Sequence, residues 1–220
     1  MITLYGFERV VPQVIGHTRD LRAQWVLEEC GLPYRVHGLD FFEGDLKSSE
    51  YHRINAFEQV PVIDDDGFIV AESAAVVLYV AEKSGKLIPA DFLGRTRVTQ
   101  WCFVAMNSVE PVLLQIAAID AGVDDDANDR KRRPALVNLA NRRFSALEER
   151  LSGQGYLADD EFSAADLLMT TVLRELRTTD LLEEYPRIKR YVAYCEDRPA
   201  WQRTLDAYEQ RLHAAPGSTR

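Results

Sequence analysis

The sequence contains few cysteines, and their positions argue against the structures that cysteines most often build. Among its 220 residues there are three, Cys30, Cys102 and Cys195, which lie far apart. Neither a disulfide framework nor a metal site has this spacing. Each cysteine falls within a helical pattern, so we expect three reduced side chains that pack inside a cytosolic protein, and no metal.

The sequence also lacks long hydrophobic runs and an excess of positive charge. No apolar run approaches the ~18 residues that span a bilayer, and no basic segment leads into an apolar one at the start, so we expect no membrane partner and no secretory leader. The formal net charge of -9 argues against a nucleic-acid partner bound through phosphates. With 46% hydrophobic and 28% charged residues, the composition is that of a soluble globular protein.

The first part of the chain alternates between strand and helix signals. The expected strands are 2–5, 34–37, 60–63 and 68–70, and the expected helices are 18–30 and 74–83. An Asp-Gly turn joins the last two strands as a hairpin. This order predicts a small mixed sheet with helices on its faces.

In the rest of the chain the strand signals vanish and helical stripes replace them. Apolar residues recur every three or four positions, as along 98–109. Ser163 followed by Asp166 matches a near variant of the helix capping box. We therefore predict an α/β domain over 1–83 and an all-helical domain over 94–212, joined by a short linker.

Two features of the α/β domain suggest where a ligand binds. Pro61 begins a strand, and a cis bond before it would point the backbone N–H and C=O of Val60 outward; the alternative is an ordinary trans proline. Ser73 is predicted to cap a helix whose first N–H groups suit a carboxylate; the alternative to a carboxylate site is that Ser73 is a cap and nothing more.

The connection between the first strand and the first helix is long and apolar. Residues 6–17 exceed the ~2–6 residues usual for such a loop. The loop ends in His17, and Thr18 and Arg19 follow directly. The apolar residues of this loop are Val10, Val11, Pro12, Val14 and Ile15.

With these motifs the chain resembles the cytosolic glutathione transferases of the bacterial theta-like, zeta-like and beta-like kinds. The similarity covers nearly the whole chain and includes ITLYGF at the start, RDLRAQWVLEECGLPY (19–34), QVPVI (59–63), ES (72–73) and FSAAD (162–166). It implies a thioredoxin-like first domain, an all-α second domain and a cytoplasmic, homodimeric detoxification enzyme. Glutathione would be a co-substrate, without any bound cofactor.

The resemblance also implies how glutathione is held. Val60, before a cis Pro61, would pair its backbone with the cysteinyl part of the tripeptide. Ser73 and its helix N-terminus would bind the γ-glutamyl carboxylate, and Glu72 the ammonium group. Gln59 would be a further amide partner.

The resemblance points to two positions for the residue that activates the thiol. The family's serine position falls near Thr18 and its cysteine position near Arg19, and the chain has neither Ser nor Cys there. Thr18 offers a hydroxyl, with a helix cap as the alternative role, and Arg19 offers charge, with a solvated residue as the alternative. His17 is either a switchable charge or a plain loop residue, and Tyr5 is expected to pack.

For the second substrate, the resemblance implies an electrophile pocket formed by Val10, Val11, Pro12, Met106 and Asn107. Core packing or a dimer contact are the alternative roles of these residues. The chain is thus predicted to be an enzyme that adds the thiolate of glutathione to small apolar electrophiles. The alternative is a glutathione-binding or protein-interaction module of the same fold with little transferase activity.

Overall fold

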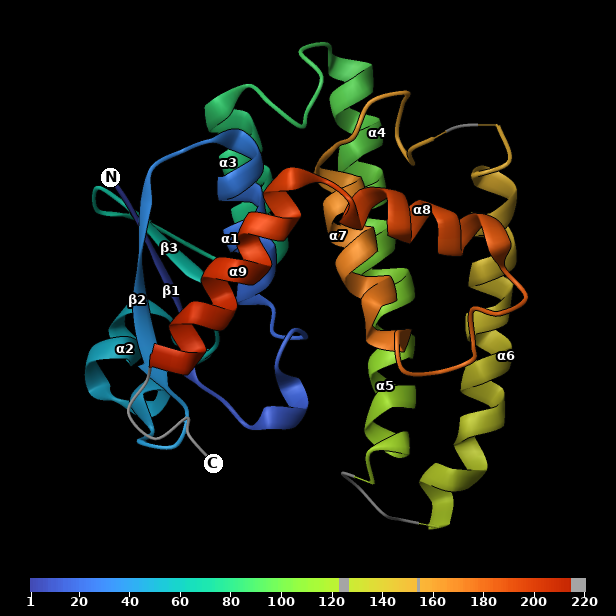
Figure 1. The fold of residues 1–220 in the computed structure, drawn as a ribbon, viewed down its shortest axis with the longest axis horizontal. Coiled ribbons are helices and arrows are strands. Elements are labelled where there is room, and N and C mark those ends of the chain that lie inside the picture. Colours follow the sequence, from blue (N-terminus) through green and yellow to red (C-terminus); the bar gives the residue numbers. More distant parts are fainter. Residues whose placement is uncertain (123–126, 154, 215–220) are drawn as a thin grey trace. The chain divides into compact units, whose positions relative to one another are not determined.

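The computed structural model describes residues 1–122, 127–153 and 155–214, which fall into two compact units (Figure 1). Unit 1 comprises Met1–Lys86 together with the chain from Asp197 on, and unit 2 comprises Leu87–Glu196. The boundary at Lys86 lies within the predicted linker. The predicted helical domain 94–212 is divided differently, because its last helix packs on the first helix of unit 1.

Unit 1 is built on a mixed sheet whose strand order is β2-β1-β3-β4. The central strand β1 runs parallel to β2 and antiparallel to β3, and β4 completes the predicted hairpin. The strands are β1 (Ile2–Arg9), β2 (Tyr34–Asp40), β3 (Val62–Asp65) and β4 (Phe68–Ala71). All the predicted strands are therefore present, and β1 and β2 are longer than expected.

Strand β1 continues past Gly6, where the sequence predicted its end. Gly6 pairs with a glycine of β2, and the ladder runs on to the end of both strands. A glycine is needed because a Cβ at this position would lie 2.7 Å from Oδ2 of Asp20 and 3.3 Å from Nη1 of Arg211. The long loop predicted over 6–17 is therefore shorter, and it contains a 3-10 turn at Pro12–Val14.

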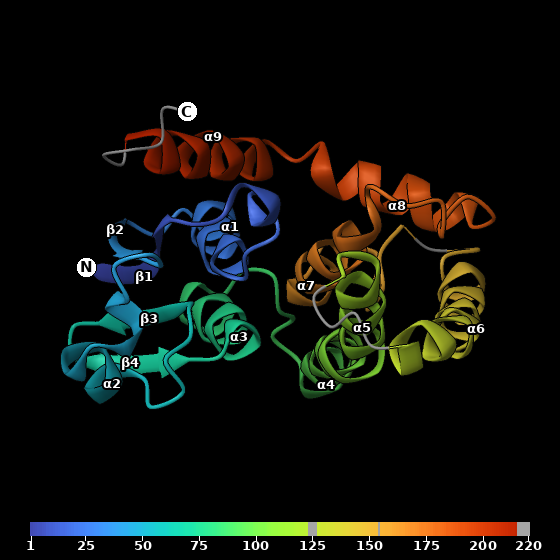
Figure 2. The same ribbon diagram turned by 90° about the horizontal axis from the view of Figure 1, so that it is seen from below.

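Helices pack on the sheet of unit 1. They are α1 (Asp20–Cys30), α2 (Ser49–Ile54), α3 (Ser73–Ser84) and α9 (Pro199–Ala214). Helices α1 and α3 lie side by side (Figure 2), whereas Tyr51 of α2 packs with Leu39 and Val62 of the sheet. Helix α9 runs along α1, where the rings of Trp25 and Trp201 are tilted by 51° to one another with centroids 4.6 Å apart, and both side chains are buried.

The regular elements of unit 2 are all helical in its described part, as predicted. Its helices are α4 (Phe92–Phe103), α5 (Glu110–Asp120), α6 (Ala127–Arg150), α7 (Ala164–Leu173) and α8 (Pro186–Glu196), with a π-helical turn at Val104–Val109. Helix α7 is buried along its whole length and begins with the predicted capping box, in which the N–H of Ser163 donates to Oδ2 of Asp166 across 2.9 Å.

One helical run of unit 2 differs from the expected absence of long apolar segments. Phe92–Asp120 is long and apolar enough to cross a membrane by length and composition, and an 18-residue stretch within it has a mean hydropathy of 1.6. The core helix of a soluble protein passes the same test. Parts of this run pack against α6 and α7 within its unit, and 39% of the 18-residue stretch is buried, so packing accounts for part of its apolar composition.

Candidate functional site

The N-terminus of α3 presents backbone N–H groups that no side chain caps. The helix begins at Ser73, and Glu72 is the residue before its first turn. The prediction that Ser73 caps the helix is therefore wrong, because Ser73 is already the first helical residue. Neither side chain bonds the first-turn N–H groups. These donors and the helix dipole make this end suitable for a carboxylate.

A buried arginine of α1 holds the hydroxyl of Ser73. Nη1 of Arg22 donates to Oγ of Ser73 across 3.2 Å, and the two residues are only 2% and 4% exposed. The guanidinium therefore adds a full positive charge beside the N-terminus of α3. The sequence reading missed Arg22, although it lies four residues before Val26, a position on the apolar side of the helix where a charge needs a buried partner.

The segment before β3 is held by hydrogen bonds to its backbone. The Val60–Pro61 peptide bond is cis, as the resemblance implies. The carbonyl of Gln59 accepts a hydrogen bond from the hydroxyl of Tyr51 and another from Nδ2 of Asn55, both 2.8 Å long. Val60 lies outside the strand ladder, which begins at Val62. The N–H and C=O of Val60 are therefore not used by the sheet.

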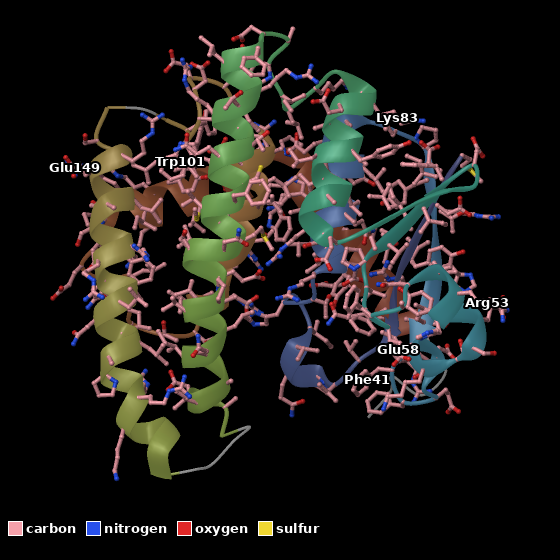
Figure 3. The ribbon with its side chains drawn as sticks, turned by 180° about the vertical axis from the view of Figure 1, so that it is seen from behind. Phe41, Arg53, Glu58, Lys83, Trp101 and Glu149 are labelled. Atoms are coloured by element: carbon pink, nitrogen blue, oxygen red, sulfur yellow. The ribbon has the colours of Figure 1, made fainter. Side chains whose placement is uncertain are left out.

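Both predicted glutathione-binding segments contain a non-glycine residue in the left-handed region. Glu72 has φ 70° and Glu58, directly before Gln59, has φ 55°. Glu58 lies beside α2 (Figure 3), where Nδ1 of His52 is 3.2 Å from its Oε1. Such backbone strain gathers at functional sites. Asp66 and Leu87 share this conformation elsewhere, so it supports the site without identifying it.

Thr18, the predicted thiol activator, bonds a tyrosine of α9. Its Oγ1 lies 2.7 Å from the hydroxyl oxygen of Tyr208, which is fully buried. The alternative role of Thr18 as a helix cap is not observed, because Arg19 is the residue before α1 and no side chain caps that helix. Burial and then the negative charge of Asp20 raise the pKa of Tyr208 to about 12, so the phenol is protonated at neutral pH.

The first residue of α1 ties three elements of unit 1 together. Oδ2 of the fully buried Asp20 accepts a hydrogen bond from the N–H of Phe7 on β1 across 3.1 Å and one from Nη2 of Arg211 on α9 across 2.8 Å. Thr18 and Arg19 immediately precede this residue. The contacts of Asp20 therefore fix the segment that carries both candidate activators, and the sequence reading did not foresee them.

The residues predicted for the electrophile pocket occur in both units. Val10 packs against an apolar cluster formed by α1 and α9, so it contributes to the core of unit 1. Val11 is partly buried and Pro12 is exposed. Met106 and Asn107 belong to the π-helical turn of unit 2, the first partly buried and the second exposed. The pocket itself stays a prediction.

Other predicted features have a structural role. Cys30, Cys102 and Cys195 are free and buried, as expected, and burial raises the pKa of Cys102 to about 12. Tyr5 packs against the cluster around Tyr51, also as expected. Within the described ranges, no three His, Cys, Asp or Glu side chains are arranged to hold a metal ion.

Comparisons with known proteins give a consistent result over most of the chain. Residues 13–82 match the family model of the glutathione S-transferase N-terminal domain, and residues 106–199 match that of the C-terminal domain. Glutathione S-transferase hmp2 of Hypomyces subiculosus is 31% identical over 80% of this chain and 88% of its own. Glutathione S-transferase D7 of Drosophila melanogaster is 26% identical over 85% of this chain and 84% of its own. A glutathione transferase of Burkholderia graminis, crystallised with two glutathione molecules per subunit, is 28% identical with a TM-score of 0.82, over 94% of this chain and 88% of its own.

Proposed function

Because the chain belongs to the glutathione S-transferase family, we propose that it adds the thiolate of glutathione to small apolar electrophiles, with Thr18 as the thiol activator. Family membership makes the chain a glutathione transferase. The assignment of individual residues and the class of electrophile are our proposal. The observation that carries the assignment is the uncapped N-terminus of α3 beside the buried guanidinium of Arg22.

In the proposed binding mode, each end of glutathione meets a group of matching chemistry. The γ-glutamyl carboxylate accepts hydrogen bonds from Ser73 and the first N–H groups of α3, and the charge of Arg22 favours it further. The exposed carboxylate of Glu72 pairs with the ammonium group. The backbone of Val60 pairs with the cysteinyl residue as one strand pairs with another, and Gln59 bonds the backbone of the tripeptide.

Catalysis then consists of lowering the thiol pKa and holding the thiolate beside the electrophile. A free thiol has a pKa of about 8.5, and lowering it by two requires about 2.7 kcal/mol of preferential thiolate stabilisation. A hydrogen bond from the hydroxyl of Thr18, a partly exposed residue, to the sulfur supplies part of this stabilisation. The positive charge of Arg19 is the second source that we propose.

A second candidate function is glutathione binding with little transferase activity. The absence of Ser and Cys at Thr18 and Arg19 favours it, because these are the family's activating residue types. We further propose that the protein is a cytoplasmic homodimer. Phe57 and Phe92 support a dimer, because they are large apolar side chains that are 78% and 79% exposed and that a second subunit would shield from water.

The binding site is tested by a double variant, Glu72→Ala with Ser73→Ala, on immobilised glutathione. We expect retention to be lost. The matched control, Glu82→Ala with Ser84→Ala, changes the same residue types at the opposite end of α3, where Lys83 is also found (Figure 3), and should be retained like the wild type. Wild-type retention of the first variant would show that the site is elsewhere.

Thiol activation is tested by the pH dependence of thiolate absorbance from bound glutathione. We expect a thiol pKa well below that of free glutathione in the wild type, and a higher value in Thr18→Ala. An unlowered pKa in the wild type would favour the binding module instead. A lowered pKa that Thr18→Ala leaves in place but Arg19→Ala raises would move the activating role to Arg19.

A further inference from the structure

The hydroxyl pair of Thr18 and Tyr208 is asymmetric, because the two oxygens differ in their surroundings. Tyr208 is fully buried, whereas Thr18 is partly exposed. The backbone N–H of Gly16 lowers the pKa of the phenol, but burial outweighs this effect, so the phenol is protonated at neutral pH. A buried phenol O–H therefore needs an acceptor of its own.

Thr18 is the acceptor that the phenol proton can reach. Among the residues that the structure describes, Oγ1 of Thr18, 2.7 Å away, is the one hydrogen-bond acceptor in contact with the Tyr208 hydroxyl. Gly16 cannot serve, because a backbone N–H only donates. The phenol consequently donates to Thr18. The hydrogen of the Thr18 hydroxyl is then left without a partner within the described part of the chain.

We propose that Tyr208 is a positioning residue for the transferase reaction: by donating to Thr18, it directs the threonine hydrogen away from the protein core and toward the glutathione sulfur. A hydroxyl that accepts one hydrogen bond is also a stronger donor in the next one. Tyr208 therefore fixes the direction of the Thr18 donor and strengthens it without touching the substrate. This inference rests on the proposed role of Thr18.

The last helix is held firmly enough for this task. On the same side of α9, Arg211 is bonded to Asp20 two residues after Thr18. Directly before α9, Nε and Nη2 of Arg198 donate to the two carboxylate oxygens of Glu29 across 2.7 and 2.9 Å. These ties to α1 hold the phenol at a fixed position relative to the start of that helix.

The test is a double-mutant cycle on Thr18→Ala and Tyr208→Phe, read out as the thiol pKa of bound glutathione. Tyr208→Phe keeps the ring and removes the hydroxyl, and we expect it to raise the thiol pKa by about 0.5 to 1, the effect of one neutral hydrogen bond. We expect glutathione affinity at a pH where the thiol is protonated to stay at the wild-type value. In the Thr18→Ala background, Tyr208→Phe should change the thiol pKa no further.

A matched control and a second variant separate positioning from folding. Tyr79→Phe removes a phenol that donates to Asp65 across 2.6 Å, far along α3 from Ser73, and should leave the thiol pKa unchanged. Site-specific difluorotyrosine at position 208 keeps the side chain and makes its proton more acidic, so it should lower the thiol pKa. A purely structural role of Tyr208 would not reverse the sign of the effect.

The outcomes distinguish this inference from the proposed function. If Thr18→Ala leaves the thiol pKa at the wild-type value, the proposed activator is wrong and the inference falls with it. If Thr18→Ala raises the pKa but Tyr208→Phe and difluorotyrosine do not move it, only the role of Tyr208 is overturned. An equal effect of Tyr208→Phe with and without Thr18 would also overturn that role.

Discussion

Arg22 and Ser73 bond one another inside unit 1, with Nη1 of the arginine 3.2 Å from Oγ of the serine and both residues almost completely buried. A guanidinium is costly to bury, so its place beside the first turn of α3 needs a compensating group. The serine hydroxyl is one of its partners. In the proposed function, the charge of Arg22 also attracts the carboxylate of glutathione.

Replacing Arg22 should therefore weaken glutathione binding. We expect Arg22→Met to reduce the affinity by about 10- to 100-fold, the effect of losing a charge-assisted interaction of about 1.5–3 kcal/mol. Isothermal titration calorimetry with glutathione measures this directly. Arg53→Met, which removes an exposed arginine of α2 (Figure 3), is the control and should bind as the wild type does. Equal affinities of the two variants for glutathione would show that Arg22 does not contribute to binding.

Gly6 should not tolerate even one additional methyl group. A Cβ would lie 2.7 Å from Oδ2 of Asp20, a fully buried side chain that is bonded to Arg211 and cannot move freely. We expect Gly6→Ala to lower the free energy of unfolding by about 1–3 kcal/mol in urea denaturation. Gly153→Ala should change it by less than about 0.5 kcal/mol, because a Cβ there meets no atom within 4 Å. A neutral Gly6→Ala would mean that Asp20 is less constrained than its contacts indicate.

Asp166 should be the most sensitive acidic residue of unit 2. Its carboxylate accepts hydrogen bonds from the N–H of Leu157, from the N–H and hydroxyl of Ser163, and from the hydroxyl of Tyr191. Asn at this position would direct an NH2 group at some of these donors. We expect Asp166→Asn to cost about 2–4 kcal/mol of unfolding free energy, and the exposed Asp160→Asn to cost almost none. Comparable urea midpoints for the two variants would contradict this.

The stability of unit 1 should depend on acid through Asp65. Hydrogen bonds from Lys83, 2.5 Å away, and then from Tyr79 hold the pKa of this carboxyl below its ordinary value. Because the folded pKa is lowered, the contribution of Asp65 is fully present above its unfolded pKa of about 3.9 and is lost as the pH falls through the folded value. Asp65→Asn should therefore be less stable than the wild type at pH 7, and the difference should vanish at strongly acidic pH.

Thermal unfolding of the wild type and of Asp65→Asn, measured from pH 7 to strongly acidic pH, tests this prediction. Lys83→Met serves as a second variant, because it removes the partner that lowers the pKa of Asp65 most and should shrink the same acid-dependent difference. A stability difference between Asp65→Asn and the wild type that stays constant from neutral to acidic pH would contradict the assignment.

The local elements could be predicted from the sequence because their signals are local. The Asp-Gly turn predicted the hairpin, and Ser163 and Asp166, which are three residues apart, predicted the capping box. Gly6 was misread as the end of a strand, since a glycine required by the approach of Asp20 looks the same in a sequence as one that ends a strand. The glutathione-binding segments were found through the family's motifs rather than through periodicity.

The connections between distant segments could not be predicted in this way. Tyr208 is 190 residues from Thr18 and Arg211 is 191 residues from Asp20. Each of these side chains lies in a helix whose pattern indicates an apolar face but not the partner of that face. The helical pattern of α9 therefore placed it with the other helices of the second domain, whereas its contacts place it with α1.

The packing of α9 on α1 has a consequence for how the protein is made. Trp25 is synthesised early and Trp201 only after the whole of unit 2, so a ribosome-bound chain that has completed residues 1–86 still lacks the helix that covers one side of α1. Unit 2 is continuous and can fold as soon as it emerges. The first unit to be translated is thus the last that can complete its native core.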